Sequence, residues 1–529
     1  MKKLFLIISS LMLSLHLWAQ TDDAEEKKNP EPLRGLEYRV EAQGSFSGEK
    51  TPLWFNANRY GLSSLEGSNG YLRAAVERPL SVDEERRWGI GYGVDVAVPF
   101  NYTSKFVVQQ AYAEGRWLHG TLTVGSKQYP MQLKNNDLSS GSQTLGINAR
   151  PVPQVRLALP DYWTLPFANG WLQLKGHIAY GWFTDGKWQE DFAGPQGKHA
   201  ESVKYHSKAG YLRIGNAERF FPFSVELGLE TASIYGGRAY VPQPDGTMQT
   251  LEGETGLKAM WHAFKGGGED AGETVYTNYS GDMLGSWVMR MNWDEDTWRL
   301  SVYADKFFED HSSMLQVDLD GYQEGDNWQA PSSKKHLFLY DFKDWMLGAE
   351  LHFKYDRPVN TILFEYLYTK YQSGPIYHDH TQNIADHLGG IDDFYNHYMY
   401  PGWQHWGQVM GNPLYLSPVY NDDGALEVRN NRFVAFHLGI DGQPFEGFKY
   451  RVLASYQEGW GTYADPYIHK HHGVSFLTEA AYDFDERTPR LDGWSARLGF
   501  AMDFGGIRGN HHGVQLTVAK KGLFQKNRR

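Results

Sequence analysis

The sequence has no cysteine, which excludes disulfide bonds, thiol catalysis and metal sites built from thiolates. Beyond its first residues it has no apolar run long enough for a transmembrane helix. Basic residues are fewer than acidic ones, 51 against 63. The resulting net charge of -12 argues against binding nucleic acid or an anionic surface through the overall field. A soluble protein of 529 residues would divide into two or more domains, whereas a large barrel would use this length as one.

The N-terminus has the pattern of a secretory signal peptide. Lys2 and Lys3 precede the apolar stretch Leu4–Leu17, and Trp18–Gln20 offers a cleavage site. We therefore predict that residues 1–20 are a signal peptide and that the chain is exported. Residues 21–34 are charged and contain proline, so we expect a flexible periplasmic lead-in. The remaining residues, 35–529, form the predicted folded domain.

Long stretches of alternating apolar and polar residues dominate this domain. In Trp494–Phe504, for example, apolar residues share one face, while Ser495, Arg497 and Asp503 lie on the other. Such stretches run for about 9–13 residues, the length that a tilted strand needs to cross a bilayer. Aromatic residues often stand at their ends, as an interfacial girdle requires. A mean hydropathy of -0.55 agrees with this interpretation, because only every second residue of a membrane strand faces lipid.

These patterns predict an all-β fold, a transmembrane antiparallel β-barrel of about 18 strands with long extracellular loops. A large secreted β-sandwich or propeller is the soluble alternative, but a propeller would show a fixed repeat, and none is apparent. Short helices are expected to plug or cap the lumen, and residues 254–266 have helical spacing. The predicted strands are 36–48, 69–80, 88–100, 106–118, 121–126, 143–158, 171–184, 203–214, 221–234, 283–293, 297–308, 345–355, 361–370, 431–441, 448–458, 473–484, 494–504 and 512–519. An even number places both termini on the periplasmic side.

The longest interval without a strand pattern, residues 371–430, is predicted to be the largest extracellular loop. It is rich in His, Tyr, Trp, Gly and Asp. Aromatic rings stack on the apolar faces of sugars, and amides and imidazoles bond to hydroxyl groups. The alternative is that these aromatic residues simply pack the loop. The candidate carbohydrate-binding residues are Trp403, Gln404, His405, Trp406 and Asn412.

Six charged side chains project into the lumen by strand parity: Glu226, Glu230, Arg299, Asp305, Glu365 and Arg497. Paired carboxylates at a suitable separation would suggest a glycoside hydrolase. Lumen charges more often pair with one another, so we predict no catalytic residue and no enzyme. His378-Asp379-His380 resembles a metal site, but adjacent strand residues point to opposite faces. We therefore expect no metal ion and no cofactor.

Four segments in combination resemble the capsule assembly (Wzi) family: Trp54–Gly61, Ala304–Met314, Tyr400–Gly407 and Met410–Leu414. The resemblance extends over nearly the whole mature chain. It implies an outer-membrane barrel of about eighteen strands and a lectin-like, non-enzymatic role in holding capsular polysaccharide at the cell surface. The partners expected are capsular or other surface polysaccharide, outer-membrane lipid and, during insertion, the barrel-assembly machinery, but no nucleic acid. A porin or substrate-specific channel is the alternative, because eighteen strands can enclose an aqueous lumen.

Overall fold

The computed structural model describes residues 33–216, 219, 221–265, 281–309, 315–318, 336–339, 343–355, 357–374, 377–379, 387–485 and 487–524. The predicted signal peptide lies outside these residues, as does most of the lead-in. Among the described residues, no helix has the length and apolar character needed to cross a membrane.

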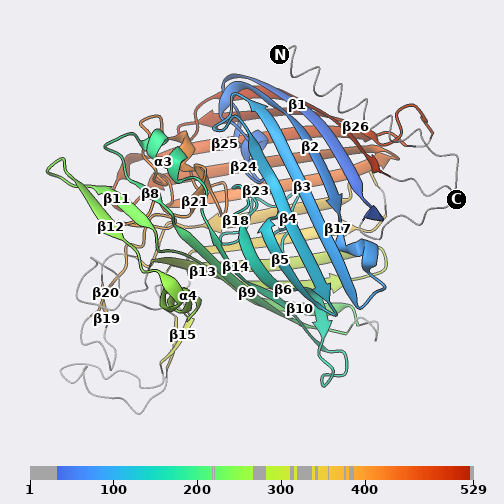
Figure 1. Cartoon of the computed structure of the whole chain (residues 1–529), viewed down its shortest axis with the longest axis horizontal. Helices are drawn as coiled ribbons and strands as arrows, with labels where there is room; N and C mark the ends of the chain where they lie inside the picture. Colours follow the sequence, from blue (N-terminus) through green and yellow to red (C-terminus); the bar gives the residue numbers. More distant parts are fainter. Residues whose placement is uncertain are drawn as a thin grey trace.

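Eighteen antiparallel strands form one closed barrel, as predicted (Figure 1). Each strand pairs with the next along the wall, and β27 pairs with β1 from Glu37↔Leu523 to Ser47↔Gly513, which closes the ring. The wall strands are β1 Glu37–Lys50, β2 Glu66–Arg78, β3 Trp88–Phe100, β4 Val107–Trp117, β5 Gly120–Ser126, β6 Gln154–Thr164, β7 Leu172–Trp182, β9 Lys204–Ile214, β10 Phe223–Tyr235, β13 Asp282–Asp294, β14 Trp298–Glu309, β17 Trp345–Phe353, β18 Thr361–Tyr368, β23 Phe433–Phe445, β24 Phe448–Gly461, β25 Pro466–Asp483, β26 Trp494–Gly505 and β27 His511–Leu523.

Alternation of side chains gives the wall an apolar exterior and a polar interior. On β26, Leu498 and Phe504 are exposed on the outside, whereas Ala501 and Asp503 are buried inside. Exposed aromatic residues gather at both ends of the wall, as a membrane girdle requires. They are Phe46, Phe100, Phe106, Trp182 and Phe504 at one end, and Trp88, Trp117, Trp293, Phe445 and Trp494 at the end that holds the termini.

The predicted sixth strand, residues 143–158, is wrong in its first two thirds. The wall strand β6 is Gln154–Thr164, and residues 127–153 run inside the barrel instead. We call residues 127–153 the inner segment. A second difference concerns β25, which begins at Pro466, so the outer connection before it is short rather than long. The other predicted strands agree with the observed ones to within a few residues.

The connections at the end opposite the termini carry the remaining elements (Figure 1). The short helix α2, Leu53–Asn56, lies inside the barrel, where the Leu53 N–H donates to Asp503 at 2.8 Å. The others are α3 Gly186–Ala193, α4 Gly256–Lys265, the 3-10 helix η5 Pro418–Tyr420, the three-stranded sheet of β8 His199–Glu201, β11 Arg238–Pro242 and β12 Met248–Glu252, and the two-stranded pairs β15 Leu315–Asp318 with β16 His336–Leu339, β19 Tyr377–Asp379 with β20 His387–Gly389, and β21 Gln404–His405 with β22 Gln408–Val409. One further 3-10 helix, η2 Leu80–Asp83, lies in a turn near the termini.

The main hydrophobic core lies inside the barrel. A ring of eighteen strands is wide enough to leave a lumen, which must be filled by protein or by water. Here α2, the inner segment and residues 390–432 enter from the outer end and pack against inward-facing wall residues. We call residues 390–432 the loop segment, which is the last part of the predicted 371–430 loop and its junction with β23. The buried side chains that it contributes include Phe394, Tyr395, Tyr400, Trp403 and Tyr415.

Candidate functional site

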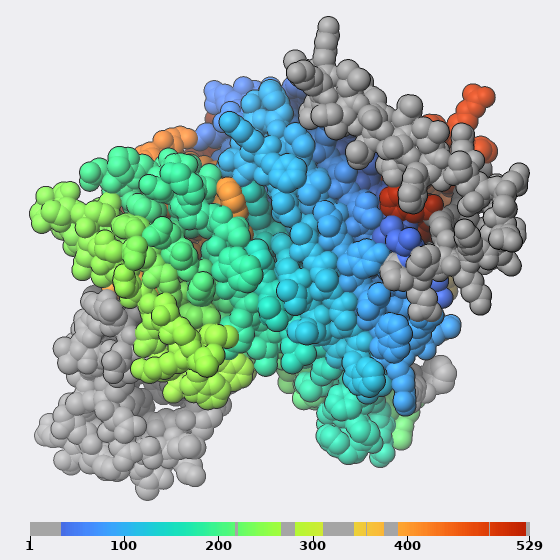
Figure 2. Space-filling view, in the orientation of Figure 1, coloured from blue at the N-terminus to red at the C-terminus, as the bar shows by residue number. Residues whose placement is uncertain are grey.

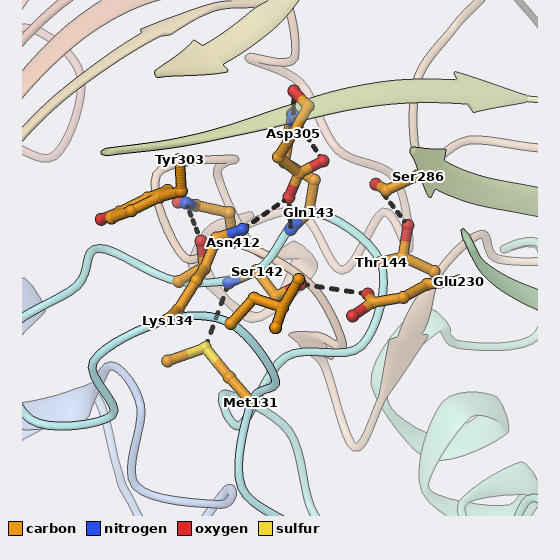
Figure 3. Close-up of polar contacts among 12 residues, drawn as sticks. Met131, Lys134, Ser142, Gln143, Thr144, Glu230, Ser286, Tyr303, Asp305 and Asn412 are labelled. Carbon is orange, nitrogen blue, oxygen red and sulfur yellow. Dashed lines mark hydrogen bonds and ion pairs between the residues drawn. The ribbon is translucent and has the colours of Figure 1, made fainter. Parts of the chain in front are cut away.

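Carboxylates on the inner face of the wall hold the inner segment in place (Figure 3). Lys134 forms a fully buried ion pair with Asp305 of β14, with the Nζ and Oδ2 atoms 2.8 Å apart. Glu230 of β10 accepts from the Ser142 hydroxyl at 3.4 Å. Breaking a buried pair leaves an uncompensated charge, which costs several kcal/mol. The wall carboxylates therefore fix where the inner segment lies.

Glu365 of β18 anchors the same segment at a third point. It accepts from the Ser139 hydroxyl at 2.6 Å and from the Ser140 N–H at 2.8 Å, and also from the Tyr303 hydroxyl. Each oxygen of this buried carboxylate thus has a donor, as burial of a charge requires. Glu365, Glu230 and Asp305 are engaged in holding the chain.

The other three charged residues singled out in the sequence lie nearer the ends of the wall. Glu226 accepts from the Tyr162 hydroxyl at 2.6 Å, and Arg299 donates to Asp294 at 2.8 Å. Arg497 lies 3.6 Å from Glu479. Glu226 and Arg299 both line a cavity of about 440 Å³ at the end of the barrel that holds the termini.

The loop segment buries four of the five candidate carbohydrate-binding residues. Trp403 is stacked on Tyr205 of the wall and donates from Nε1 to the Thr144 carbonyl at 3.0 Å. Asn412 donates to the Ser140 hydroxyl and to the Gly141 carbonyl. The side chains of Trp403, Gln404, His405 and Asn412 are all 2% exposed or less. In this conformation they join the loop segment to the inner segment and the wall, and they offer no surface to a sugar.

Trp406, the fifth candidate, lies at the tip of the β21–β22 hairpin. Trp406 and Gly407 form its two-residue turn with φ of 56° and 77°. Turns of this kind favour glycine or asparagine, and a tryptophan at positive φ is uncommon. The Trp406 N–H donates to Asp185 at 2.8 Å, which stabilises this conformation. Sparsely populated backbone conformations persist where the surroundings enforce them, and they concentrate at functional sites.

Around Trp406 lies a cluster of aromatic rings, Trp188, Phe192 and Trp406, which we call the outer aromatic cluster. Trp188 and Phe192 are four residues apart on α3, so both lie on one face of the helix. Their rings stack with centroids 4.9 Å apart, and Trp188 lies 6.2 Å from Trp406. The Arg150 guanidinium lies 4.2 Å from the Trp406 ring on its inner side. All three rings are only partly buried.

A cleft of about 500 Å³ adjoins this cluster where Gly424 packs against the Phe192 backbone. It combines an exposed ring, that of Tyr398, with amide, ammonium and carboxylate groups. A hydrogen bond from Arg429 lowers the pKa of Asp423, which keeps that carboxylate ionised at neutral pH. The lining includes Gln196, Lys198, Val241, Pro242, Tyr398, Asp423, Leu426 and Glu427. Together these groups suit a ligand with apolar ring faces and many hydroxyl groups.

His405 holds the β21–β22 hairpin in place and is neutral. Its Nδ1 lies 2.9 Å from the Arg150 carbonyl and therefore carries the proton, so that Nε2 accepts from Thr184. Burial lowers the pKa of His405, although the charge of Asp185 opposes this effect. A second proton on Nε2 would face the Thr184 N–H, so protonation opposes the observed geometry.

No metal site is built by the residues whose side chains the structure describes, among which no three His, Asp or Glu groups converge. His380 and the side chains of His378 and Asp379 lie outside the described residues. The sequence patterns did not predict the inner segment, and they did not single out Trp188 or Phe192. Pro130, Pro151 and Pro153 bracket the inner segment, and proline is disfavoured inside a sheet. The four-residue spacing of Trp188 and Phe192 was the available indication of a helix.

No protein-family profile matches the chain. No curated protein sequence matches it either. Among solved structures it is similar to Wzi of Escherichia coli, described as an outer-membrane, carbohydrate-binding β-barrel involved in group 1 capsule assembly. The TM-score is 0.55, with 11% identity over 93% of this chain and 86% of that one. At this identity the likeness shows the fold alone, that of an outer-membrane β-barrel.

Two further solved structures also match, with lower TM-scores. OccAB2 of Acinetobacter baumannii gives a TM-score of 0.45 and 8% identity, over 93% of this chain and 99% of that one. OprD of Pseudomonas aeruginosa gives 0.41 and 10%, over 92% and 94%.

Proposed function

We propose that this outer-membrane barrel is a lectin-like, non-enzymatic protein that binds capsular or other surface polysaccharide at its outer face. The observation that carries the proposal is the outer aromatic cluster beside the polar cleft, above a lumen filled by the chain's own segments. Membership of the capsule assembly (Wzi) family is part of the proposal. It is supported by the four sequence segments and by the likeness in fold.

The proposed binding mode assigns one task to each group. Trp406 and Trp188 present ring faces on which the apolar faces of sugars stack. Gln196, Asp423 and Glu427 bond to hydroxyl groups. Stacking on one aromatic ring contributes roughly 1–3 kcal/mol when the scale for nucleic-acid bases is borrowed. A long polysaccharide that binds this site on several copies of the protein gains avidity from the number of sites.

The test measures binding of purified barrel to capsular and other surface polysaccharides on a glycan array. A Trp188→Ala/Trp406→Ala variant should lose roughly tenfold or more in affinity, since it removes two stacking surfaces. Trp117→Ala is the matched control, because Trp117 is exposed at the opposite end of the wall. Unchanged binding by the double variant would contradict the assignment of the site. Cells that lack the protein yet retain all of their capsule would contradict the proposed role.

A substrate-specific channel is the second candidate, favoured by the cavity of about 440 Å³ at the end with the termini. Lys175, Arg213 and Arg299 line it together with Glu226, which is a polar environment suited to solute passage. The inner segment and the loop segment stand between this cavity and the outside. Single-channel recordings separate the candidates, because a steady open conductance favours the channel and silence favours the binder.

A further inference from the structure

Helix α4 lies against the outside of the barrel, not in its lumen. Tyr211 of β9 donates to the inward-facing Glu230, so Lys208, three residues earlier, faces outward. Lys208 donates to the Phe264 carbonyl in the last turn of α4, and Tyr180 of β7 donates to the Met260 carbonyl at 3.1 Å. The segment predicted to plug or cap the lumen is thus a helix on the outer wall, where it stands out in Figure 1 and Figure 2.

The two faces of α4 differ sharply. Ala259 and Ala263 are buried against the wall. On the opposite side, Leu257 is 83% exposed and Trp261 is 58% exposed, and their spacing of four residues places them on one stripe. Lys258 extends beside them with its side chain 75% exposed. A helix that combines exposed apolar, aromatic and lysine side chains is typical of the membrane interface.

An apolar groove of about 420 Å³ lies in the lipid-facing surface of the same strands. Its lining includes the small outward residues Gly210 and Ala304. A Cβ atom added at Gly210 would meet no atom within 4 Å, so the space above this glycine is open. The walls include Leu212, Leu227, Leu229, Trp287 and Met289. The groove therefore has room for a hydrocarbon chain against the wall.

Helix and groove meet at Lys208. Lys208 and Gly210 are two residues apart on β9, so they neighbour each other on the outer face. Among the described residues at the helix, Lys204, Lys208, Lys258 and Lys265 outnumber Glu254, which lies 3.7 Å from the Lys258 ammonium.

We propose that α4 and this groove bind one acylated, phosphorylated glycolipid of the outer leaflet. One acyl chain lies in the groove over Gly210, the phosphate lies among the lysines at α4, and Leu257 and Trp261 enter the surrounding lipid. The site is continuous with the lipid-facing wall. Helix α4 lies at the end opposite the termini, which faces outward in barrels of this kind, and the groove extends from it along the middle of the wall strands. The proposal is independent of polysaccharide binding at the outer aromatic cluster.

The test is native mass spectrometry of the full-length barrel extracted from outer membranes in mild detergent. The wild-type protein should retain one copy of lipid A, the probe for this chemistry. Gly210→Leu fills the groove and should lower the retained fraction about tenfold. Gly115→Leu is the matched control, because Gly115 also faces outward with open space above it. Equal retention by both variants would overturn the groove assignment.

A second arm tests the headgroup on delipidated barrel, with lipid A, its dephosphorylated form and phosphatidylglycerol as competing probes. Lipid A should bind most tightly, and Lys258→Gln/Lys265→Gln should remove its advantage over the dephosphorylated form. Equal binding of all three probes, or a preference for phosphatidylglycerol, would overturn the proposal. Both lysines are exposed residues of α4 and belong to no wall strand, so the variant retains the barrel. The heat-dependent gel shift of folded barrels checks this.

Discussion

The inside of the barrel and its outer face use the same residue types for different purposes. Trp403 and Trp406 are three residues apart on one hairpin, yet Trp403 is sealed between the wall and the inner segment, whereas Trp406 contributes a partly open ring to the outer aromatic cluster. The difference arises from the surroundings of each ring. The Trp403 ring packs against the inner segment, which wall carboxylates hold in place. The Trp406 ring lies beside α3 and the cleft. Residue type alone therefore does not tell a packing residue from a binding residue.

The sharpest test of this comparison is to truncate each tryptophan in turn. Trp403→Ala should lower the free energy of unfolding by about 3–5 kcal/mol, because it leaves a cavity in a packed interior. Trp406→Ala should lower it by less than about 1 kcal/mol while weakening polysaccharide binding. Urea unfolding of refolded barrel in detergent measures the first quantity. Similar losses of stability for both variants would remove the distinction between inside and outside.

The second test breaks the anchor of the inner segment. Lys134→Met leaves Asp305 buried without its partner and should cost about 3 kcal/mol of stability. The double variant Lys134→Met/Asp305→Leu removes both charges and should recover most of that loss. A double variant as unstable as the single one would show that the ion pair is not what holds the segment.

The third test concerns the contact between the inner segment and the loop segment. Asn412→Ala removes three side-chain hydrogen bonds, two that the amide donates and one that it accepts from the Leu414 N–H, and leaves the Gly141 carbonyl buried without this donor. We expect a loss of about 1–3 kcal/mol, which urea unfolding again measures. Gln249→Ala serves as the control, because the Gln249 side chain accepts a hydrogen bond from Gln243 at an exposed position. An equal loss in the control would contradict a special role for the inner contact.

The smallest expected effect is a dependence on pH through His405. Burial lowers its pKa in the folded state, so the unfolded chain binds more protons below pH ~6.5. The contribution of His405 to the free energy of unfolding is therefore fully present above pH ~6.5 and is lost as the pH falls below that value. Its loss is no more than about 1.4 kcal/mol per pH unit. Unfolding curves of wild type and His405→Gln between pH 7.5 and 5 should show this difference in slope. Parallel curves would contradict it.

The wall was predictable from the sequence because its pattern is local. Apolar and polar residues alternate along each strand, and this period is visible without knowledge of any neighbour. The inner segment was not predictable in this way. Residues 143–153 contain Leu145 and Ile147 among polar residues, which resembles a strand. What takes this stretch out of the wall is a set of contacts with Asp305 and Ser286 on distant strands.

The candidate site was predictable only in part, for the same reason. The aromatic density of residues 371–430 indicated a special region, but burial separates Trp406 from Trp403, Gln404, His405 and Asn412. That separation depends on the positive φ of Trp406, on the Asp185 carboxylate and on Thr144 of the inner segment. None of these contacts leaves a local pattern near residue 406.

The anchors of the inner segment also set an order of events during assembly. Lys134 precedes Asp305 by 171 positions, and Ser139 precedes Glu365 by 226. The segment can therefore make these contacts only once β14 and β18 are in place beside it. The ring closes only when β27, the last strand, reaches β1. Filling of the lumen thus depends on contacts between residues that are far apart in the sequence, and such contacts are slow to form.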